Sequence, residues 1–229
     1  MKSLLLSNPD YTTLLLHGLG LTVQLFCVSW IAAMMLACLL ASLRLSPVRW
    51  VQMVVGLFVA YHRNVPGLVQ IFVWYFGVPQ LLPMPWQDWL NRHNGEFILS
   101  CIALSLYAAA YMSEDIRSGF RSISPGQTQA ARALGLSGYQ TMLYVLLPQA
   151  LRMTVAPLVN QSLSLFKATS LAMTIGVAEL MHAARRIENE TYRTFDAFLI
   201  VSICYLAGSW LLMGIGWWVT RRQAIKAAS

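Results

Sequence analysis

The sequence has few charged residues. Asp, Glu, Lys and Arg make up 11% of its 229 residues, whereas a soluble globular chain has roughly 25%. None of these four residue types occurs between positions 17 and 43, a stretch longer than the ~20 residues that a helix needs to cross a bilayer. Mean hydropathy is positive, at +0.57. These values exclude an ordinary soluble domain and indicate a protein that crosses the membrane several times.

The sequence also lacks the motifs of covalent catalysis. It contains no G-x-x-x-x-G-K-[ST] phosphate-binding loop, no G-x-S-x-G and no H-E-x-x-H, and its four cysteines have no metal or redox spacing. We therefore expect no enzymatic activity, no cofactor and no metal site in this chain. If ATP drives the protein, a separate subunit must hydrolyse it.

Apolar runs recur along the chain and are separated by short polar junctions. We expect an all-α fold with about five transmembrane helices, and a single transmembrane domain over residues 1–229. The expected spans are 19–43, 66–83, 97–117, 153–176 and 197–219.

The charged residues are distributed unevenly between the junctions. Most Arg and Lys residues lie in 44–65, 117–152 and the tail after 219, whereas most acids lie in the other junctions. Because Lys and Arg accumulate on the cytoplasmic side, we expect a multi-pass membrane protein with these junctions in the cytoplasm. Its N-terminus would lie outside and its C-terminus in the cytoplasm. The net charge of +7 therefore indicates how the chain is oriented in the membrane and does not indicate DNA binding.

A polar insert at 124–147 interrupts this apolar pattern. Ser124, Pro125 and Gln127 have the order of an N-cap, a first-turn proline and a capping box. Gly135 suits the left-handed position that follows a helix. Ser137 and Gln140 repeat the capping pattern. The insert therefore predicts two short helices joined by a sharp turn.

A helix-turn-helix that binds DNA is an alternative reading of this insert, because "QAARALGLS" looks like the first half of one. A recognition helix, however, needs polar side chains at its start to contact bases. The second helix here reads "YQTMLYVLLPQA", which is mostly apolar. We therefore expect no nucleic-acid partner.

The insert resembles a known signature. Gln129-Ala130-Ala131, Gly135 and Val145-x-Leu147-Pro148 match the spacing of the "EAA…G…I-LP" motif of ATP-binding cassette (ABC) importer permease subunits. In that family the two helices couple the spans to the ATP-hydrolysing subunit, and the first of them sits in a groove on that subunit. The resemblance assigns this coupling role to Gln129, Ala130, Ala131, Gly135, Leu136 and Ser137. Gln129 replaces the usual Glu, which puts an ion pair at that position in doubt.

Further segments resemble the polar-amino-acid branch of these permeases. These segments are 61–83, 108–119, 147–180 and 191–198. The first contains "RNVP" and is most similar to the corresponding segment of glutamate/aspartate permease subunits. The resemblance implies import of a polar amino acid, with glutamate or aspartate as the expected substrate. It also implies a pair of ATP-binding subunits, a periplasmic amino-acid-binding protein, surrounding lipid and a second permease subunit. A permease of this family lies in the bacterial inner membrane, so the resemblance implies a periplasmic N-terminus and a cytoplasmic C-terminus. A heterodimer is expected, and pairing of the chain with itself stays open.

Lys167 is the most informative ionisable residue because it lies deep inside an expected span. A lysine at that depth costs roughly 2.5–3.5 kcal/mol, so it is expected to face a cavity or a partner. Its ammonium group could hold the α-carboxylate of an amino acid. Relatives often carry Asp where this chain has Ala168, and with neutral Gln161 nearby this favours an acidic or neutral substrate. The alternative is a structural ion pair of Lys167 with Glu114 or Glu179.

Four further residues are candidates for substrate binding, and Gln161, on the same helix face as Lys167, is one of them. Gln70 follows the helix break at Pro66 and could present its amide to the cavity, or it could make an ordinary hydrogen bond between helices. Thr169 and Ser170 could donate to a carboxylate, although hydroxyls in membrane helices often bond to their own backbone.

Glu114, Asp115 and Arg117 lie where the third expected span meets the cytosol. We interpret Glu114 and Arg117 as a structural ion pair that positions the insert. Two other functions remain as alternatives. An ion-coupled secondary transporter would need several acids within its spans, and this chain has few. A non-transporting membrane anchor or sensor subunit would need neither the insert nor Lys167.

Overall fold

The computed structural model describes the backbone of residues 8–228 and the side chains of residues 8–221. Within 8–228 every regular element is helical, so the all-α prediction is confirmed. Four helical segments are long and apolar enough to cross a membrane. They are α1 (Pro9–Arg44), α5 (Gly95–Arg121), the run Gly138–Ile175 that contains α8 (Leu147–Ala168), and Thr194–Arg221 of α10 (Thr194–Ala228). They contain the expected spans 19–43, 97–117 and 197–219, and all of 153–176 except its last residue.

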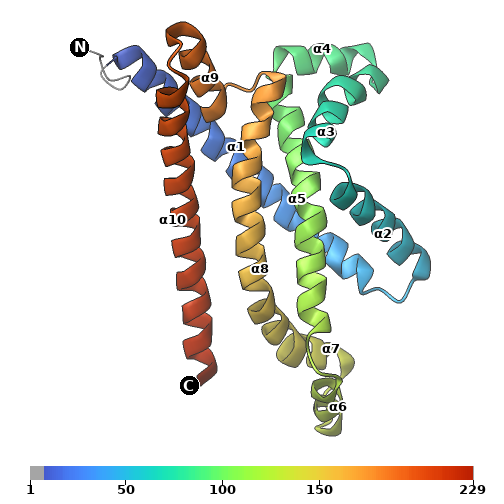
Figure 1. Ribbon diagram of the computed structural model, residues 1–229. Helices are drawn as coiled ribbons and strands as arrows, with labels where there is room; N and C mark the ends of the chain where they lie inside the picture. Colours follow the sequence, from blue (N-terminus) through green and yellow to red (C-terminus); the bar gives the residue numbers. More distant parts are fainter. Residues whose placement is uncertain (1–7, 229) are drawn as a thin grey trace.

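The remaining expected span, 66–83, differs from the structure. It contains α3 (Gly67–Phe72), a π-helical stretch η2 (Val73–Gly77) and a 3-10 turn η3 (Val78–Leu81). This apolar segment, Gly67–Leu81, is shorter than the other four. The polar junction before it, expected as a connection, folds as a helix, α2 (Arg49–Asn64). In Figure 1, α2 and α3 follow one another up the side of the bundle, so the fifth segment is a broken helix that includes α2.

The break between α2 and α3 follows from Pro66. Proline carries no N–H and disfavours a helical conformation at the residue before it, and Val65 is extended, with φ −95° and ψ 129°. Carbonyl groups of α2 therefore lose their helical donors. The Nε2 atom of Gln70 donates to the carbonyl oxygens of His62, at 2.9 Å, and Val65, at 2.7 Å. Gln70 thus ties the two halves of the broken helix together.

Helix α5 forms the centre of the bundle. It packs against α1, α8, α2 and α3, and Figure 1 shows α8 beside it and α1 crossing both at an angle. The core between these helices consists mainly of small and aliphatic side chains, which allow the helices to approach closely. Examples are Leu25, Ala33, Leu104, Ala108 and Leu165.

The shorter helices lie at the two ends of the bundle. Helices α4 (Met84–Arg92) and α9 (Leu180–Thr191) lie at the end where α1 begins, whereas α6 (Pro125–Ala133) and α7 (Gly138–Gln140) lie at the opposite end. Helix α10 finishes towards the α6 end (Figure 1). The described chain therefore starts at one end of the bundle and finishes at the other, as an odd number of spans requires.

Helix α10 packs against α8 through a close contact at Gly216. A Cβ atom added there would lie 2.6 Å from a methyl group of Val159, and at Gly214 it would meet nothing within 4 Å. Val159 has little freedom to move aside because β-branched side chains are stiff.

We predict opposite effects of alanine at these two glycines. Gly216→Ala should destabilise the protein by about 1–3 kcal/mol through overpacking. Gly214→Ala should be neutral or stabilising by up to ~1 kcal/mol, because alanine favours the helix. Thermal unfolding of the detergent-purified variants, followed by circular dichroism, measures both. Equal melting temperatures would contradict the α8–α10 packing.

Candidate functional site

The insert between α5 and α8 begins at a capped helix. The Oγ atom of Ser124 accepts a hydrogen bond from the N–H of Gly126, at 3.3 Å, and Pro125 is the first residue of α6. The predicted capping box with Gln127 is wrong. The side-chain oxygen of Gln127 instead accepts from Nε2 of Gln149 in α8, at 3.3 Å. This bond links α6 directly to the helix that follows the insert.

Gly135 makes the turn that was expected after α6. Its φ is +80°, a region that L-residues with a side chain avoid. The N–H of Gly135 donates to the carbonyl of Arg132, at 2.9 Å, and the N–H of Leu136 donates to that of Ala131, at 3.1 Å. These bonds satisfy carbonyls at the end of α6. The direction of α6 is thus set by a defined backbone turn.

The second half of the insert is continuous with α8. The predicted capping box is present, because Oγ of Ser137 accepts from the N–H of Gln140, at 3.2 Å, and the side-chain oxygen of Gln140 accepts from the N–H of Ser137, at 2.9 Å. After α7 the chain forms a π-helical stretch, η4 (Thr141–Leu146), and enters α8 at Leu147. Pro148 has no N–H to donate to the carbonyl one turn earlier. The π-helical stretch η4 before it is wider than an α-helix and accommodates the missing hydrogen bond.

The end of the insert exposes apolar side chains. Leu134 and Tyr139 are 82% and 76% exposed, and Gln129, Ala130 and Ser137 are also exposed. Among the other residues proposed for coupling, Ala131 is buried where α6 packs against η4 and Leu136 is half-buried. Large exposed apolar side chains beside polar ones are typical of a surface that binds another protein.

Lys167 lines a cavity of about 430 Å³ near the end of α8. Its side chain is exposed, and among residues 8–221 no carboxylate lies within ion-pair distance of it. Glu114 pairs with two arginines, and Glu179 accepts hydrogen bonds from other groups. The alternative of a structural ion pair for Lys167 therefore finds no support. The other residues of the cavity are Ser170, Met181, Phe198, Val201, Ser202, Tyr205, Leu206 and Ser209.

The other four candidate substrate residues are dispersed. Ser170 shares the cavity with Lys167, although its Oγ donates to the Lys167 carbonyl at 2.7 Å. Thr169 is fully buried, and its Oγ1 donates to the carbonyl of Phe166 at 2.6 Å. Gln161 interacts with Asp115 of α5, and Gln70 closes the break before α3. The structure thus brings together only Lys167 and Ser170.

Helix α10 supplies polar groups to the cavity that were not predicted. Ser202, Tyr205 and Ser209 face Lys167 across it. Their spacing of three and four residues places them on one side of a helix, within a segment that is otherwise strongly apolar. This polar stripe was visible in the sequence and could have identified the opposite wall.

Tyr205 is held on the cavity wall by Glu179, which is fully buried at the start of α9. The carboxylate accepts from the Tyr205 hydroxyl at 3.0 Å and from the N–H groups of Met181, at 2.8 Å, and His182, at 3.0 Å. Thr22 of α1 contacts it at 3.4 Å. Burial raises the pKa of Glu179, whereas these hydrogen bonds act to lower it. This group therefore joins α1, α9 and α10 beside the cavity.

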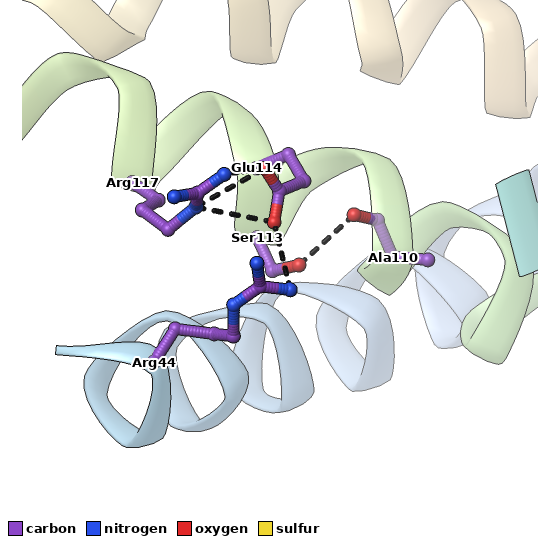
Figure 2. Close-up of polar contacts among 5 residues, drawn as sticks. All are labelled: Arg44, Ala110, Ser113, Glu114 and Arg117. Atoms are coloured by element: carbon purple, nitrogen blue, oxygen red, sulfur yellow. Dashed lines mark hydrogen bonds and ion pairs between the residues drawn. The ribbon is translucent and has the colours of Figure 1, made fainter. Parts of the chain in front are cut away.

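A second carboxylate joins α1 to α5. Figure 2 shows Glu114 between Arg117 of its own helix and Arg44 at the end of α1. Arg117 Nε lies 3.1 Å from one carboxylate oxygen, and an Arg44 nitrogen lies 3.4 Å from the other. The ion pair Glu114–Arg117 expected from the sequence is present, and Arg44 extends it between helices.

The chain matches the family model described as "Binding-protein-dependent transport system inner membrane component" over residues 32–225. Two relatives are similar over most of their length. A probable amino-acid ABC transporter permease protein, PatM of Vibrio harveyi, is 34% identical and aligns with 84% of this chain and 83% of its own. The glutamate/aspartate import permease protein GltJ of Escherichia coli (strain K12) is 32% identical, over 87% of this chain and 82% of its own.

A solved structure supports the same grouping. It is described as the crystal structure of an amino acid ABC transporter with histidines. It superimposes with a TM-score of 0.84 at 28% identity and covers 97% of this chain and 100% of the other. This structure is described with histidines, whereas GltJ is described as a glutamate/aspartate permease. The similarities therefore point to permeases of amino-acid ABC transporters and do not specify which amino acid is carried.

We predict that Glu114→Gln destabilises the protein by about 1–3 kcal/mol, because it leaves two partly buried guanidinium groups without their carboxylate. The control is Glu190→Gln, which removes the exposed Arg186–Glu190 pair and should cost no more than ~0.5 kcal/mol. Thermal unfolding in detergent measures both. The α1–α5 link would be refuted if the two variants melted alike.

Proposed function

Because the chain belongs to the family of binding-protein-dependent transport system inner membrane components, as a permease subunit of an amino-acid ABC transporter, we propose that it imports glutamate or aspartate. Permease subunits of this kind are transport components, and the ATPase activity resides in a separate subunit. The chain would form one half of the translocation pore. The observation that carries the substrate assignment is the Lys167 cavity.

The charge of this cavity favours an acidic substrate. Its wall carries one ammonium group, four hydroxyl groups and no carboxylate among the residues that line it. An acid here would repel a substrate with a second carboxylate, and Ala168 stands where many relatives have Asp. The α-carboxylate would contact Lys167. The hydroxyls of Ser170, Ser202 and Tyr205 already donate within the protein, so Ser209 is the hydroxyl that could donate to the side-chain carboxylate. The resemblance to glutamate/aspartate permeases supports the same choice.

The coupling segment 124–147 would dock on the ATP-binding subunit. Its fixed turn at Gly135 and its exposed Leu134 and Tyr139 suit a rigid surface seated in a groove. We place Gln129, Ala130, Ala131, Gly135, Leu136 and Ser137 at or beside this contact. Closure of a pair of ATP-binding subunits would then move α6 and, through the continuous run Gly138–Ile175, the end of α8 that carries Lys167. Alternating access would follow as a shift between two arrangements of the bundle.

The proposed assembly has the α6 end of the bundle in the cytoplasm. The N-terminus would then be periplasmic and the C-terminus cytoplasmic, as the distribution of Arg and Lys favours. A periplasmic amino-acid-binding protein would dock at the end formed by α4 and α9. A second permease subunit would complete the pore, and we propose a heterodimer by resemblance to glutamate/aspartate permeases.

The substrate proposal predicts a charge-specific effect at Lys167. In proteoliposomes with the ATP-binding subunit, second permease and binding protein, glutamate and aspartate should stimulate ATP hydrolysis, whereas arginine and lysine should not. Lys167→Met should lower this stimulation at least about tenfold, the effect of one lost charge-assisted contact. Lys167→Arg should retain part of it because the positive charge remains. Normal glutamate uptake by Lys167→Met would end the carboxylate-binding role.

The coupling proposal predicts an effect at Gly135 that acts through the backbone. A Cβ atom at Gly135 meets nothing within 4 Å in this chain, so Gly135→Ala strains the positive φ, at a cost of about 1–2 kcal/mol, and adds no clash inside the chain. We expect uptake per hydrolysed ATP to fall about tenfold. Gly138→Ala is the control, because Gly138 also meets nothing within 4 Å and begins a helix. Equal coupling in the two variants would refute the role of the turn.

A further inference from the structure

Another polar cavity lies between α4, η2 and the start of α5, at the end of the bundle where α1 begins (Figure 1). Its volume is about 510 Å³. The polar groups in its wall are one carboxylate, two amides and one phenol, carried by Glu96, Gln87, Asn91 and Tyr75. It shares no residue with the Lys167 cavity, and neither the family match nor the proposed substrate site accounts for it.

The cavity lies at the level of the lipid headgroups. Helix α5 has 27 residues, so at 1.5 Å per residue it is about 40 Å long. Because the hydrocarbon core of a bilayer is about 30 Å thick, the ends of α5 extend into the headgroup layers. Glu96 is in the first turn of α5, and residues 97–113 after it include no Asp, Glu, Lys or Arg. The Glu96 carboxylate is therefore at the boundary between the headgroups and the apolar core of the membrane.

Glu96 has no cationic partner among residues 8–221. It is half-buried, and no Lys, Arg or His of that range lies within ion-pair distance of its carboxylate. The Nε2 atom of Gln87 donates to the carbonyl of Leu82 at 2.9 Å, which leaves the Gln87 amide oxygen as an acceptor. The wall therefore offers one negative charge and a neighbouring acceptor, a combination that suits a ligand with an ammonium group.

A cation stands at the same end of α4. Arg92 is the last residue of α4 and directly follows Asn91 of the cavity wall. It is exposed, and within the described range 8–221 no carboxylate lies at ion-pair distance from it. A guanidinium group binds a phosphate through parallel hydrogen bonds. The Glu96 carboxylate and the Arg92 guanidinium together match the two charges of a zwitterionic phospholipid headgroup.

Exposed apolar side chains continue from the cavity along the bundle. Phe76 lines the cavity and is 55% exposed, and Phe72 and Val73, about one turn earlier in the chain, are exposed as well. On α4 the exposed rings of Trp86 and Trp89 lie 6.4 Å apart. Tryptophan is enriched where the hydrocarbon core meets the headgroups. The polar cavity is thus continuous with an apolar surface on which acyl chains can lie.

We propose that this cavity binds a phospholipid whose headgroup carries a primary amine. Its ammonium group binds Glu96 and the amide oxygen of Gln87, its phosphate binds Arg92, and its acyl chains lie along the exposed side chains of α3 and η2. A primary ammonium has three N–H donors, whereas the quaternary ammonium of choline has none. The site therefore selects ethanolamine over choline headgroups. This inference goes beyond the proposed function and does not depend on which amino acid is carried.

The test compares two lipids that differ only in the amine. The complete transporter is purified in detergent, and its binding of phosphatidylethanolamine and phosphatidylcholine with identical acyl chains is titrated by native mass spectrometry. The wild type should bind the ethanolamine lipid about tenfold more tightly, the scale of one charge-assisted hydrogen bond. Glu96→Gln should remove this preference and leave the affinity for the choline lipid unchanged. Glu96→Asp should retain part of the preference because the negative charge remains.

The matched control is Asp88→Asn, which removes an exposed carboxylate of α4 that is outside the cavity and should leave the preference unchanged. Arg92→Gln should weaken the binding of both lipids by the same factor, because both carry the phosphate. Equal affinity of the wild type for the two lipids would overturn the proposal. An equal loss of preference in Asp88→Asn and Glu96→Gln would also overturn it, since the effect would then belong to the general surface charge.

A lysine of the amino-acid-binding protein is the other source of an ammonium group at this end of the bundle. The affinity of that protein for the wild-type and Glu96→Gln transporters is therefore measured in nanodiscs of phosphatidylcholine alone. An affinity that is the same for both transporters supports the lipid site. A loss of about tenfold in Glu96→Gln, with the preference for the ethanolamine lipid intact, would assign the cavity to the binding protein and refute the lipid site.

Discussion

The structure depends on the continuity of one helical run. Residues 138–175 form an uninterrupted segment that begins beside α6 and ends beyond Lys167. A break in the helix at Pro148 would separate segment 124–147 from the bundle. The π-helical stretch η4 before Pro148 instead keeps the backbone helical. A helix transmits displacement along its axis, whereas a loop would absorb it. Movement of α6 therefore has a direct route to the Lys167 cavity, the proposed substrate site.

Buried polar groups hold the other helices around this run. Unsatisfied polar groups cost several kcal/mol in a membrane, so each cluster acts as a fixed connection. Gln70 joins the halves of the broken helix, Glu114 joins α1 to α5, and Glu179 joins α1, α9 and α10. Since these connections link helices far apart in sequence, the bundle is expected to move as bodies of several helices rather than helix by helix.

Local features were predicted from the sequence better than long-range ones. Gly135 and the capping box at Ser137 depend on neighbouring residues only, and the structure contains both. The sequence of α2 was interpreted as a polar junction because Arg49 and Arg63 stand at the ends of its apolar residues. The partner of Gln127 and the α10 wall of the Lys167 cavity depend on which helices meet, which periodicity does not specify.

The most direct test of this account is the accessibility of α6. Leu134, 82% exposed, is replaced by cysteine in a chain whose four native cysteines are alanine, and a membrane-impermeant maleimide is added to oriented vesicles. We predict labelling only from the cytoplasmic side, and protection when the ATP-binding subunits are bound. Labelling from the periplasmic side, or equal labelling with and without those subunits, would contradict the coupling of α6 to ATP hydrolysis.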